Sequence, residues 1–347
     1  MSIIFNRAIF LHNSFIFAAF AAFYRFQKRF FLVFALFTRK RLTFQSFDFK
    51  IKVMKGLIIV NAYAKEASQL NQPLRLKEEF RKIGVETDVR PLDVSACGIS
   101  DGDITVKYKG YDFCVFYDKD KHALLQLEKS GLKCFNCYSA MTDCDDKMLT
   151  YIKLAGFGIP MPETYSASLC YSSYGSINGD SIDFLAGKLG FPMIVKECYG
   201  SLGKGVHIVR DKAELADAAE RLRFVPHVYQ KFIAESKGTD LRIIVVGGKY
   251  VGAMKRTSSG DFRSNVSAGG RGEAFDADEK TVTLAEKIAR ILKLDYCGID
   301  FLFGKSGLIL CEVNSNAFFK EFEKVTGINV AEKYAAHIIR SVKDLKA

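Results

Sequence analysis

The chain has 347 residues, 49% hydrophobic, which is long enough for a large core divided into two or three lobes. Its formal net charge is +11 at pH 7, but residues 1–53 hold nine Lys or Arg against a single acid, Asp48. Removing that segment's +8 from the total leaves +3 for residues 54–347, so charge gives little support to a nucleic-acid-binding protein.

The first 53 residues differ in composition from the rest of the chain. They contain 14 of the 30 phenylalanines, and their longest uncharged run, residues 8–24, is shorter than the ~20 residues of a membrane span. No convincing signal-peptide cleavage site follows this run. We interpret residues 1–53 as upstream translated sequence or a disordered extension, with Met54 as the working start. A membrane-associated segment is the minority alternative.

Nine cysteines, all after residue 96, show no regular spacing, which indicates reduced thiols and a cytoplasmic protein. Cys134 and Cys137 form one CxxC pair, but no second pair or suitably spaced histidines complete a zinc site. We interpret both as ordinary thiols.

Residues 54–140 alternate between strand and helix patterns, which predicts an open α/β lobe. The apolar run GLIIVNAY is typical of a buried parallel strand. The predicted strands are 56–63, 85–93, 112–118 and 133–136, and the predicted helices are 69–83 and 120–130.

The remaining chain predicts an α+β region of hairpin strands with flanking helices. Asp145 or Asp146 caps a helix that stops at Gly156 or Gly158. Residues 191–209 read as strand, glycine-rich loop and strand. The other predicted strands lie in 227–233, 240–256 and 296–314, and the other predicted helices are 212–222, 278–293 and 329–342.

The loop YGSLGKGV (199–206) places Gly200, Gly203 and Gly205 between two strands, where glycines let the backbone approach phosphate oxygens. Its spacing fits neither a Walker loop nor a Rossmann fingerprint. A glycine-rich hairpin that binds nothing is an open alternative. Lys196, inside the preceding apolar strand, favours a phosphate contact, against the alternative of an edge lysine reaching to water.

Four basic residues follow in and after the strands of 240–256: Arg242, Lys255, Arg256 and Arg263. Guanidinium groups at such positions suit phosphate or carboxylate recognition. A solvated charged face is the alternative for Lys255 or Arg256.

Three polar residues interrupt the apolar strands of 296–314. Glu312 and Asn314 share one strand face, and Asp300 can lie near them across the hairpin. Two carboxylates and an amide oxygen suit Mg²⁺ that bridges nucleotide phosphates. The alternative is a solvent-exposed face, but the neighbours of these residues are apolar.

These features together resemble the ATP-grasp superfamily, most closely its RimK-like carboxylate–amine ligases. The resemblance covers most of residues 54–347 and is densest from about 143 to 340. The order and spacing of the matching segments make it specific. They are DDKMLT (145–150), FPMIVKECYGSLGKGV (191–206), YQKFI (229–233), GTDLRIIVVG (238–247), GDFRSN (260–265), GIDFL (298–302), CEVNSN (311–316) and EKVTGINVAEKYAAHI (323–338).

The resemblance implies a three-lobed fold in which ATP lies between two α+β subdomains. Residues 54–140 would form a pre-ATP-grasp domain, 141–228 a lid subdomain, and 229–347 the catalytic subdomain. The implied nucleotide-binding residues are Lys147, Lys196, Gly200, Ser201, Gly203, Gly205, the hinge Gln230, Lys231, Phe232 and Ile233, and Asp240 near the ribose. The implied catalytic residues are Arg242, Arg263 and Asn265, and the implied metal ligands are Asp300, Glu312 and Asn314.

The implied reaction is ATP-driven amide formation through an acyl phosphate, with no covalent protein nucleophile. The expected cofactors are ATP and Mg²⁺, with two ions, and Mn²⁺ as an alternative metal. The expected partners are a small-molecule or peptide carboxylate and an amino-acid amine such as glutamate. We expect no nucleic-acid or membrane partner. The resemblance also makes a homo-oligomer possible, because members of the family commonly form dimers or tetramers.

Two positions depart from the family pattern: Lys231 stands where an acidic residue is usual, and SNAFFKEF follows where Ser-Pro-Gly is usual. The second departure indicates a different substrate. An ATP-binding sensor or membrane-complex partner without ligase activity is the alternative function, and loss of turnover with retained ATP binding would identify it. Salt-dependent DNA binding by residues 54–347 would revive the nucleic-acid hypothesis.

Overall fold

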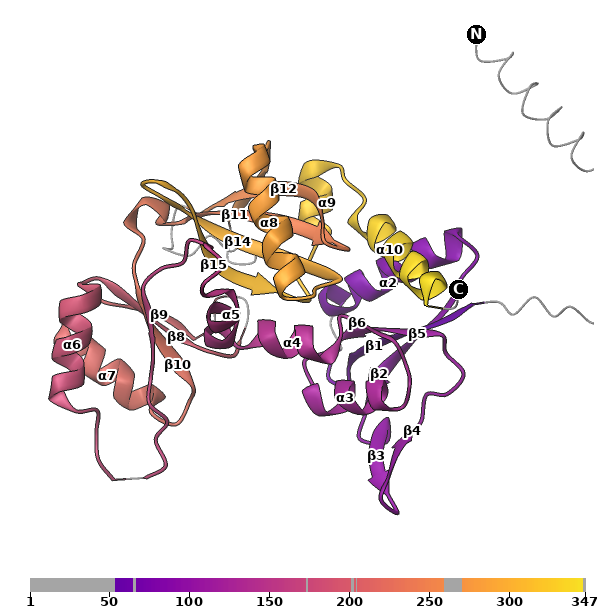
Figure 1. Ribbon diagram of the computed structural model, residues 1–347, viewed down its shortest axis with the longest axis horizontal. Coiled ribbons are helices and arrows are strands. Elements are labelled where there is room, and N and C mark those ends of the chain that lie inside the picture. Colours follow the sequence, from indigo (N-terminus) through magenta and orange to yellow (C-terminus); the bar gives the residue numbers. More distant parts are fainter. Residues whose placement is uncertain are drawn as a thin grey trace, which may run out of the picture. The chain divides into compact units, whose positions relative to one another are not determined.

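A computed structural model describes residues 54–64, 67–172, 174–200, 203, 205–258 and 270–345, all within one compact unit, Val53–Ala347 (Figure 1). The interpretation of residues 1–53 lies outside the described residues. Within the described ranges, no helix has both the length and the apolar character to cross a membrane.

The first lobe contains a four-stranded parallel sheet in the order β2-β1-β5-β6, which confirms the predicted α/β lobe. The apolar run in β1 forms a central strand because both of its faces are buried. A short hairpin, β3 (Cys97–Ser100) and β4 (Asp103–Val106), was not predicted. The other elements are β1 (Lys55–Asn61), α2 (Ala67–Lys82), β2 (Glu86–Leu92), β5 (Phe113–Tyr117), α3 (Lys121–Lys129) and β6 (Cys134–Phe135).

Two short helices, α4 (Tyr138–Asp145) and α5 (Lys147–Leu154), follow the first lobe. Asp146, not Asp145, caps α5, because its side chain accepts hydrogen bonds from the backbone N–H groups of Met148 and Leu149.

A second, antiparallel sheet has the order β7-β10-β8-β9. Helices α6 and α7 pack on one of its faces in a separate hydrophobic core that includes Leu185, Val195, Leu215 and Tyr229. Helix α6 was not predicted. The elements are β7 (Thr164–Ser166), α6 (Gly179–Leu189), β8 (Met193–Glu197), β9 (Val206–Val209), α7 (Lys212–Leu222) and β10 (His227–Lys231).

The third sheet has five antiparallel strands in the order β13-β12-β11-β14-β15. Alternate residues of β11 enter different cores: Ile243 and Val245 pack with α5 and α8, whereas Ile244 and Val246 pack with α10. The elements are β11 (Thr239–Val246), β12 (Lys249–Thr257), β13 (Arg271–Phe275), α8 (Glu279–Ile291), β14 (Tyr296–Gly304), β15 (Gly307–Asn314), α9 (Lys320–Thr326) and α10 (Val330–Asp344), with a 3₁₀ turn at Ala234–Ser236.

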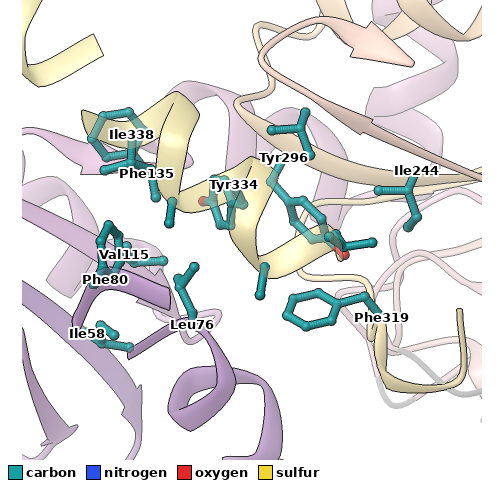
Figure 2. Close-up of a cluster of buried hydrophobic side chains, with 14 of the residues drawn as sticks. Ile58, Leu76, Phe80, Val115, Phe135, Ile244, Tyr296, Phe319, Tyr334 and Ile338 are labelled. Carbon is teal, nitrogen blue, oxygen red and sulfur yellow. The ribbon is translucent and has the colours of Figure 1, made fainter. Parts of the chain in front are cut away.

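One hydrophobic core joins the first lobe to the five-stranded sheet. Figure 2 shows Phe80 and Phe135 of the first lobe on one side of Tyr334, and Tyr296 and Phe319 on the other. The rings of Tyr296 and Tyr334 are stacked with centroids 5.0 Å apart. Helix α10 therefore lies beside α2 and completes the core of a lobe far from it in sequence.

The buried Asn136 ties the same two regions together with all four hydrogen bonds of its amide. Its Nδ2 donates to the carbonyl oxygens of Tyr296, at 2.7 Å, and Ser315, at 2.9 Å. Its Oδ1 accepts from the backbone N–H groups of Asp295, at 2.6 Å, and Tyr296, at 3.0 Å. A fully satisfied buried amide fixes one arrangement of the segments that it joins.

A charged network on α2 reaches the start of α10. Glu79 is 4% exposed and accepts hydrogen bonds from Arg75, Lys82 and Asn329, the N-cap residue of α10. Burial alone would raise the pKa of Glu79, but the hydrogen bonds from Asn329, Arg75 and Lys82 lower it to about 2. The ionised carboxylate therefore stabilises the junction between α2 and α10.

We expect Glu79→Gln to lower the free energy of unfolding at pH 7 by about 2 kcal/mol. Because the folded pKa lies below the unfolded value, this stabilisation is present above pH 4.5 and is lost as the pH falls toward 2. Urea unfolding of both proteins between pH 7 and pH 2.5 measures the difference. The exposed Glu78→Gln is the matched control, with an expected change below about 0.5 kcal/mol. A constant difference at all pH values would contradict this account.

Candidate active site

One face of the five-stranded sheet changes from apolar to polar along β11. Ile244 and Val246 enter the core with α10, but Asp240 and Arg242, on the same face, are charged. The strand register places Asp240 opposite Arg256 of β12, and Arg242 opposite Asp300 of β14. Because paired residues share a face, the sheet gathers these four side chains at one end.

Asp300 lies at the centre of this charged group and is 2% exposed. Arg242 Nε donates to its Oδ1 at 2.7 Å, and Arg242 Nη2 donates to its Oδ2 at 2.6 Å. Arg256 Nη2 lies 3.0 Å from the same Oδ2. Burial opposes ionisation of this carboxyl, but Arg242 and Arg256 together hold the pKa of Asp300 below its usual value.

The alternative of a solvated Arg256 was wrong. Its guanidinium is paired with Asp240, with Nε 2.6 Å from Oδ1, and the residue is only 3% exposed. Burial would lower the pKa of Arg256, but Asp300 and Asp240 outweigh it and raise it. The neighbouring Lys255 points to the other face of the sheet and is half-exposed. Its Nζ lies 3.2 Å from Oε1 of Glu273 in β13. Strand alternation thus separates the two basic residues.

The three expected metal ligands lie together at the edge of this group. Asp300 is paired with Glu312 in the strand register, and Asn314 Nδ2 lies 3.0 Å from Glu312 Oε1 and 3.5 Å from Asp300 Oδ2. All three are half-buried or buried. Two carboxylates and an amide are hard oxygen donors, which fit Mg²⁺. Among the described residues, no cluster of three His, Cys, Asp or Glu offers another metal site.

Lys147, the first residue of α5, contacts the base of the glycine-rich loop. Its Nζ donates to the carbonyl oxygens of Cys198, at 3.4 Å, and Gly200, at 3.3 Å. The loop glycines Gly200, Gly203 and Gly205 have φ values of 125°, 72° and 71°, in the region that favours glycine. A Cβ at Gly205 would also lie 2.6 Å from the Glu197 side chain. The positive φ is what favours glycine at this position, because the flexible end of the Glu197 side chain can move away from a Cβ.

Lys196 is buried, at 4% exposure, in β8, a strand with neighbours on both sides. The alternative of an edge lysine reaching to water was therefore wrong. Its Nζ lies 3.3 Å from the hydroxyl oxygen of Tyr151. Burial would lower the pKa of Lys196, but Tyr151, Cys311 and Glu312 together raise it, so Lys196 stays charged.

The two lysines share Glu312 as an anionic neighbour. The pKa of Lys147 is lowered overall. Burial lowers it most, the positive charge of Lys196 also lowers it, and the Glu312 carboxylate raises it. The positive charges of both lysines and the negative charge of Glu312 therefore act on one region between β8 and β15. Such a region suits the phosphates of a nucleotide together with a divalent cation.

The expected hinge begins inside β10, with Gln230 and Lys231 as the last two residues of the strand and Phe232 and Ile233 after it. Gln230 is 3% exposed and donates from Nε2 to Tyr151 Oη at 3.0 Å and to Thr164 Oγ1 at 2.7 Å. The Lys231 side chain is exposed, and its backbone N–H donates to the Glu163 carbonyl at 2.9 Å. The inward polar side chain at the hinge is therefore Gln230, and the unusual Lys231 lies on the solvent side. Phe232 and Ile233 are half-buried beyond the strand.

The expected residues Ser201, Arg263 and Asn265 lie outside the described residues. Sequence analysis missed Tyr151, whose hydroxyl contacts Lys196, Gln230 and the Cys311 carbonyl, at 2.6 Å from the last. One signal was present: Tyr151 lies four residues after Lys147 on α5, so the two share a helix face. The tyrosine, however, fits the apolar pattern of that helix equally well.

This arrangement is that of an ATP-grasp ligase fold. The crystal structure of D-alanine–D-alanine ligase from Bacillus anthracis complexed with ATP superposes with a TM-score of 0.64 at 19% identity, over 84% of this chain and 98% of that one. The family model for the RimK-like ATP-grasp domain matches residues 144–338. The chain therefore belongs to the RimK-like ATP-grasp family, which confirms the resemblance and the fold class expected from sequence.

Two curated relatives differ in how much of their length this chain spans. The human protein named beta-citrylglutamate synthase B is 39% identical over 230 residues, 65% of this chain but only 58% of that protein. A probable alpha-L-glutamate ligase from Xanthomonas euvesicatoria pv. vesicatoria is 33% identical over 293 residues, 80% of this chain and 96% of that protein. The chain thus spans little more than half of the first relative and nearly all of the second.

Proposed function

We propose that the protein is an ATP-dependent carboxylate–amine ligase that forms an amide bond through an acyl-phosphate intermediate. The observation that carries this proposal is the convergence of Asp300, Glu312 and Asn314 on a sheet face that also bears Arg242. The charge of Glu312 also acts to raise the pKa values of Lys147 and Lys196, against the effect of burial. Family membership supports the same assignment.

Each residue has one proposed role. Lys147 and Lys196 hold ATP phosphates, and the glycines of the loop present backbone N–H groups to them. The hinge at Gln230–Ile233 holds the adenine, and Asp240 lies near the ribose. Arg242, with the expected Arg263 and Asn265, orients the substrate acid and the transferring phosphoryl group. The acid attacks the γ-phosphate in line, ADP leaves, and the amine then displaces phosphate from the acyl phosphate.

We assign the metal site to Asp300, Glu312 and Asn314, for two Mg²⁺ ions or Mn²⁺ in their place. A bound divalent cation would neutralise charge on the phosphates during transfer. Asp300 already receives hydrogen bonds from two arginines, whereas Glu312 has no Lys or Arg within 4.0 Å among the described residues. Glu312 is therefore the carboxylate with the most capacity for a metal ion.

The proposed substrates are a small-molecule or peptide carboxylate and an amino-acid amine, with glutamate as the first candidate. The two relatives, a probable alpha-L-glutamate ligase and a beta-citrylglutamate synthase, support glutamate. We also propose lobe boundaries near residues 140 and 228, although α4 and α5 pack against the five-stranded sheet.

The nine cysteines are free thiols, which supports a cytoplasmic location as a further part of the proposal.

The test is ADP release by the purified full chain with Mg-ATP, across pairs of carboxylic acids and amino acids that include citrate, N-acetylaspartate, short peptides and glutamate. Release that requires both an acid and an amine, and that disappears in Glu312→Ala, is the expected result. Glu273→Ala, an exposed acid on β13 of the same sheet, is the matched control. ATP binding without release for any pair would contradict ligase activity and favour an ATP sensor.

A further inference from the structure

We propose that Tyr151 is a positioning residue that fixes the orientation of the Gln230 amide and thereby makes the nucleotide site select a 6-amino purine over a 6-oxo purine. This inference rests on the proposed function, in which the hinge at Gln230–Ile233 holds the base. It assigns a role to a residue that neither the motifs nor the reaction chemistry identifies.

The Tyr151 hydroxyl has one proton, and its direction is determined. Tyr151 Oη lies 2.6 Å from the Cys311 carbonyl oxygen, which can only accept a hydrogen bond. The residue is 5% exposed, and burial raises the pKa of its hydroxyl, so the proton stays on the oxygen. Toward every other neighbour, Tyr151 Oη can therefore act only as an acceptor. Lys196 Nζ, at 3.3 Å, is a donor and agrees with this assignment.

The Thr164 hydroxyl is directed in the same way. Its Oγ1 donates to the Pro162 carbonyl at 2.8 Å, so it too can only accept from its other neighbours. One end of the Gln230 amide lies 3.0 Å from Tyr151 Oη and 2.7 Å from Thr164 Oγ1. Two acceptors around one amide end require that end to be the NH₂ group, with both of its protons used. The amide orientation of Gln230 thus follows from its neighbours.

The opposite end of the Gln230 side chain is then the carbonyl oxygen, Oε1, which can only accept. Gln230 shares its sheet face with Lys196, because Val228 pairs with Lys196 and lies two residues from Gln230 on β10. Adenine carries an amino group at position 6, which donates, whereas guanine and hypoxanthine carry an oxygen there, which accepts. An acceptor fixed at the hinge favours the amino group, and it leaves the oxygen of a 6-oxo purine unpaired.

The experiment compares ATP with inosine triphosphate, which has hypoxanthine in place of adenine and the same triphosphate. Isothermal titration of the full chain with each Mg-nucleotide gives a ratio of affinities. Loss of the Tyr151 contact to Lys196 affects both nucleotides alike, so the ratio isolates the base. We expect the wild-type protein to prefer ATP, and Tyr151→Phe to reduce this preference about tenfold, because the freed amide can turn its NH₂ group toward the base.

Tyr229→Phe is the matched control. Tyr229 is also buried and lies next to Gln230 on β10, but it points to the opposite face, where its hydroxyl contacts His227 Nε2 at 2.9 Å. Its removal should leave the ratio unchanged. Thr164→Val removes the second acceptor while keeping the side-chain shape. If Tyr151→Phe does not fold, the ratio of ATP to inosine triphosphate affinity is measured in Thr164→Val instead.

Each outcome decides a different point. A ratio that falls in Tyr151→Phe or Thr164→Val but not in Tyr229→Phe supports the proposal. An unchanged ratio in both Tyr151→Phe and Thr164→Val, or a wild-type protein that binds both nucleotides equally, overturns it and leaves the ligase proposal intact. Failure of the wild-type protein to bind any Mg-nucleotide would instead overturn the proposed function.

Discussion

Replacing Glu312 with glutamine is expected to reduce Mg²⁺-dependent ADP release about 1,000-fold. Glutamine has nearly the same shape and keeps an oxygen that can contact Asn314, 3.0 Å from Glu312 Oε1. It removes, however, the negative charge that we propose holds a divalent cation and that balances Lys147 and Lys196. A lost charge at a phosphoryl-transfer site removes several kcal/mol of stabilisation, and each 1.4 kcal/mol is about tenfold in rate.

The measurement separates metal binding from nucleotide binding. Steady-state ADP release is followed at increasing Mg²⁺ and Mn²⁺, and ATP affinity is measured separately in EDTA. We expect the metal dependence to be lost while metal-free ATP binding is retained, because the variant still has both lysines. Glu273→Gln on the same sheet should behave as the wild type. If Glu312→Gln keeps more than a tenth of the activity, our metal-site assignment is wrong.

Replacing Arg256 with leucine is expected to lower the free energy of unfolding by about 3–5 kcal/mol, the usual loss when one partner of a buried ion pair is removed. Asp240 would remain buried at 6% exposure without its bidentate partner, and Asp300 would lose one of the two arginines that contact it within the described part of the chain. Leucine preserves much of the packing volume, so the loss reports mainly on charge. Urea unfolding followed by circular dichroism measures it.

Two further variants separate charge from packing at this site. Lys255→Leu changes the adjacent, half-exposed residue of β12 and should alter stability by less than about 1 kcal/mol. Adding Asp240→Asn to Arg256→Leu removes a buried negative charge that has lost its Arg256 partner, and it should restore part of the lost stability. Equal losses for Arg256→Leu and Lys255→Leu would show that the buried network contributes little.

Sequence patterns predicted the long amphipathic helices and the paired strands well, because their apolar spacing reports directly on burial. The patterns failed at α6. A stretch rich in Ser and Gly precedes this helix and predicts a loop, although Ile182, Leu185 and Leu189 have helical spacing. They also missed the β3–β4 hairpin. That hairpin turns at Asp101 and Gly102, with φ of 52° and 85°, but has mostly exposed residues.

At the candidate site, motif spacing brought Asp300, Glu312 and Asn314 together correctly because a short hairpin sets their register. Arg256 and Tyr151 depend on information that spacing does not contain. Arg256 is buried by its pairing with Asp240, across a hairpin whose register the sequence leaves open. Tyr151 meets Cys311, 160 residues away, through the packing of α5 on the five-stranded sheet. Long-range register and packing, unlike periodicity, cannot be read from a local stretch of residues.

The pairing of β7 with β10 has a consequence for exchange of modules between related proteins. Thr164 at the start of the segment lies opposite Gln230 at its end, and the segment between them has its own core with α6 and α7. A chimaera with a relative's corresponding segment therefore needs only two adjacent junctions. It would import the relative's counterparts of Lys196 and the glycine-rich loop while leaving Glu312 and the proposed metal site in place. The proposed phosphate contacts would then be exchanged separately from the proposed metal ligands.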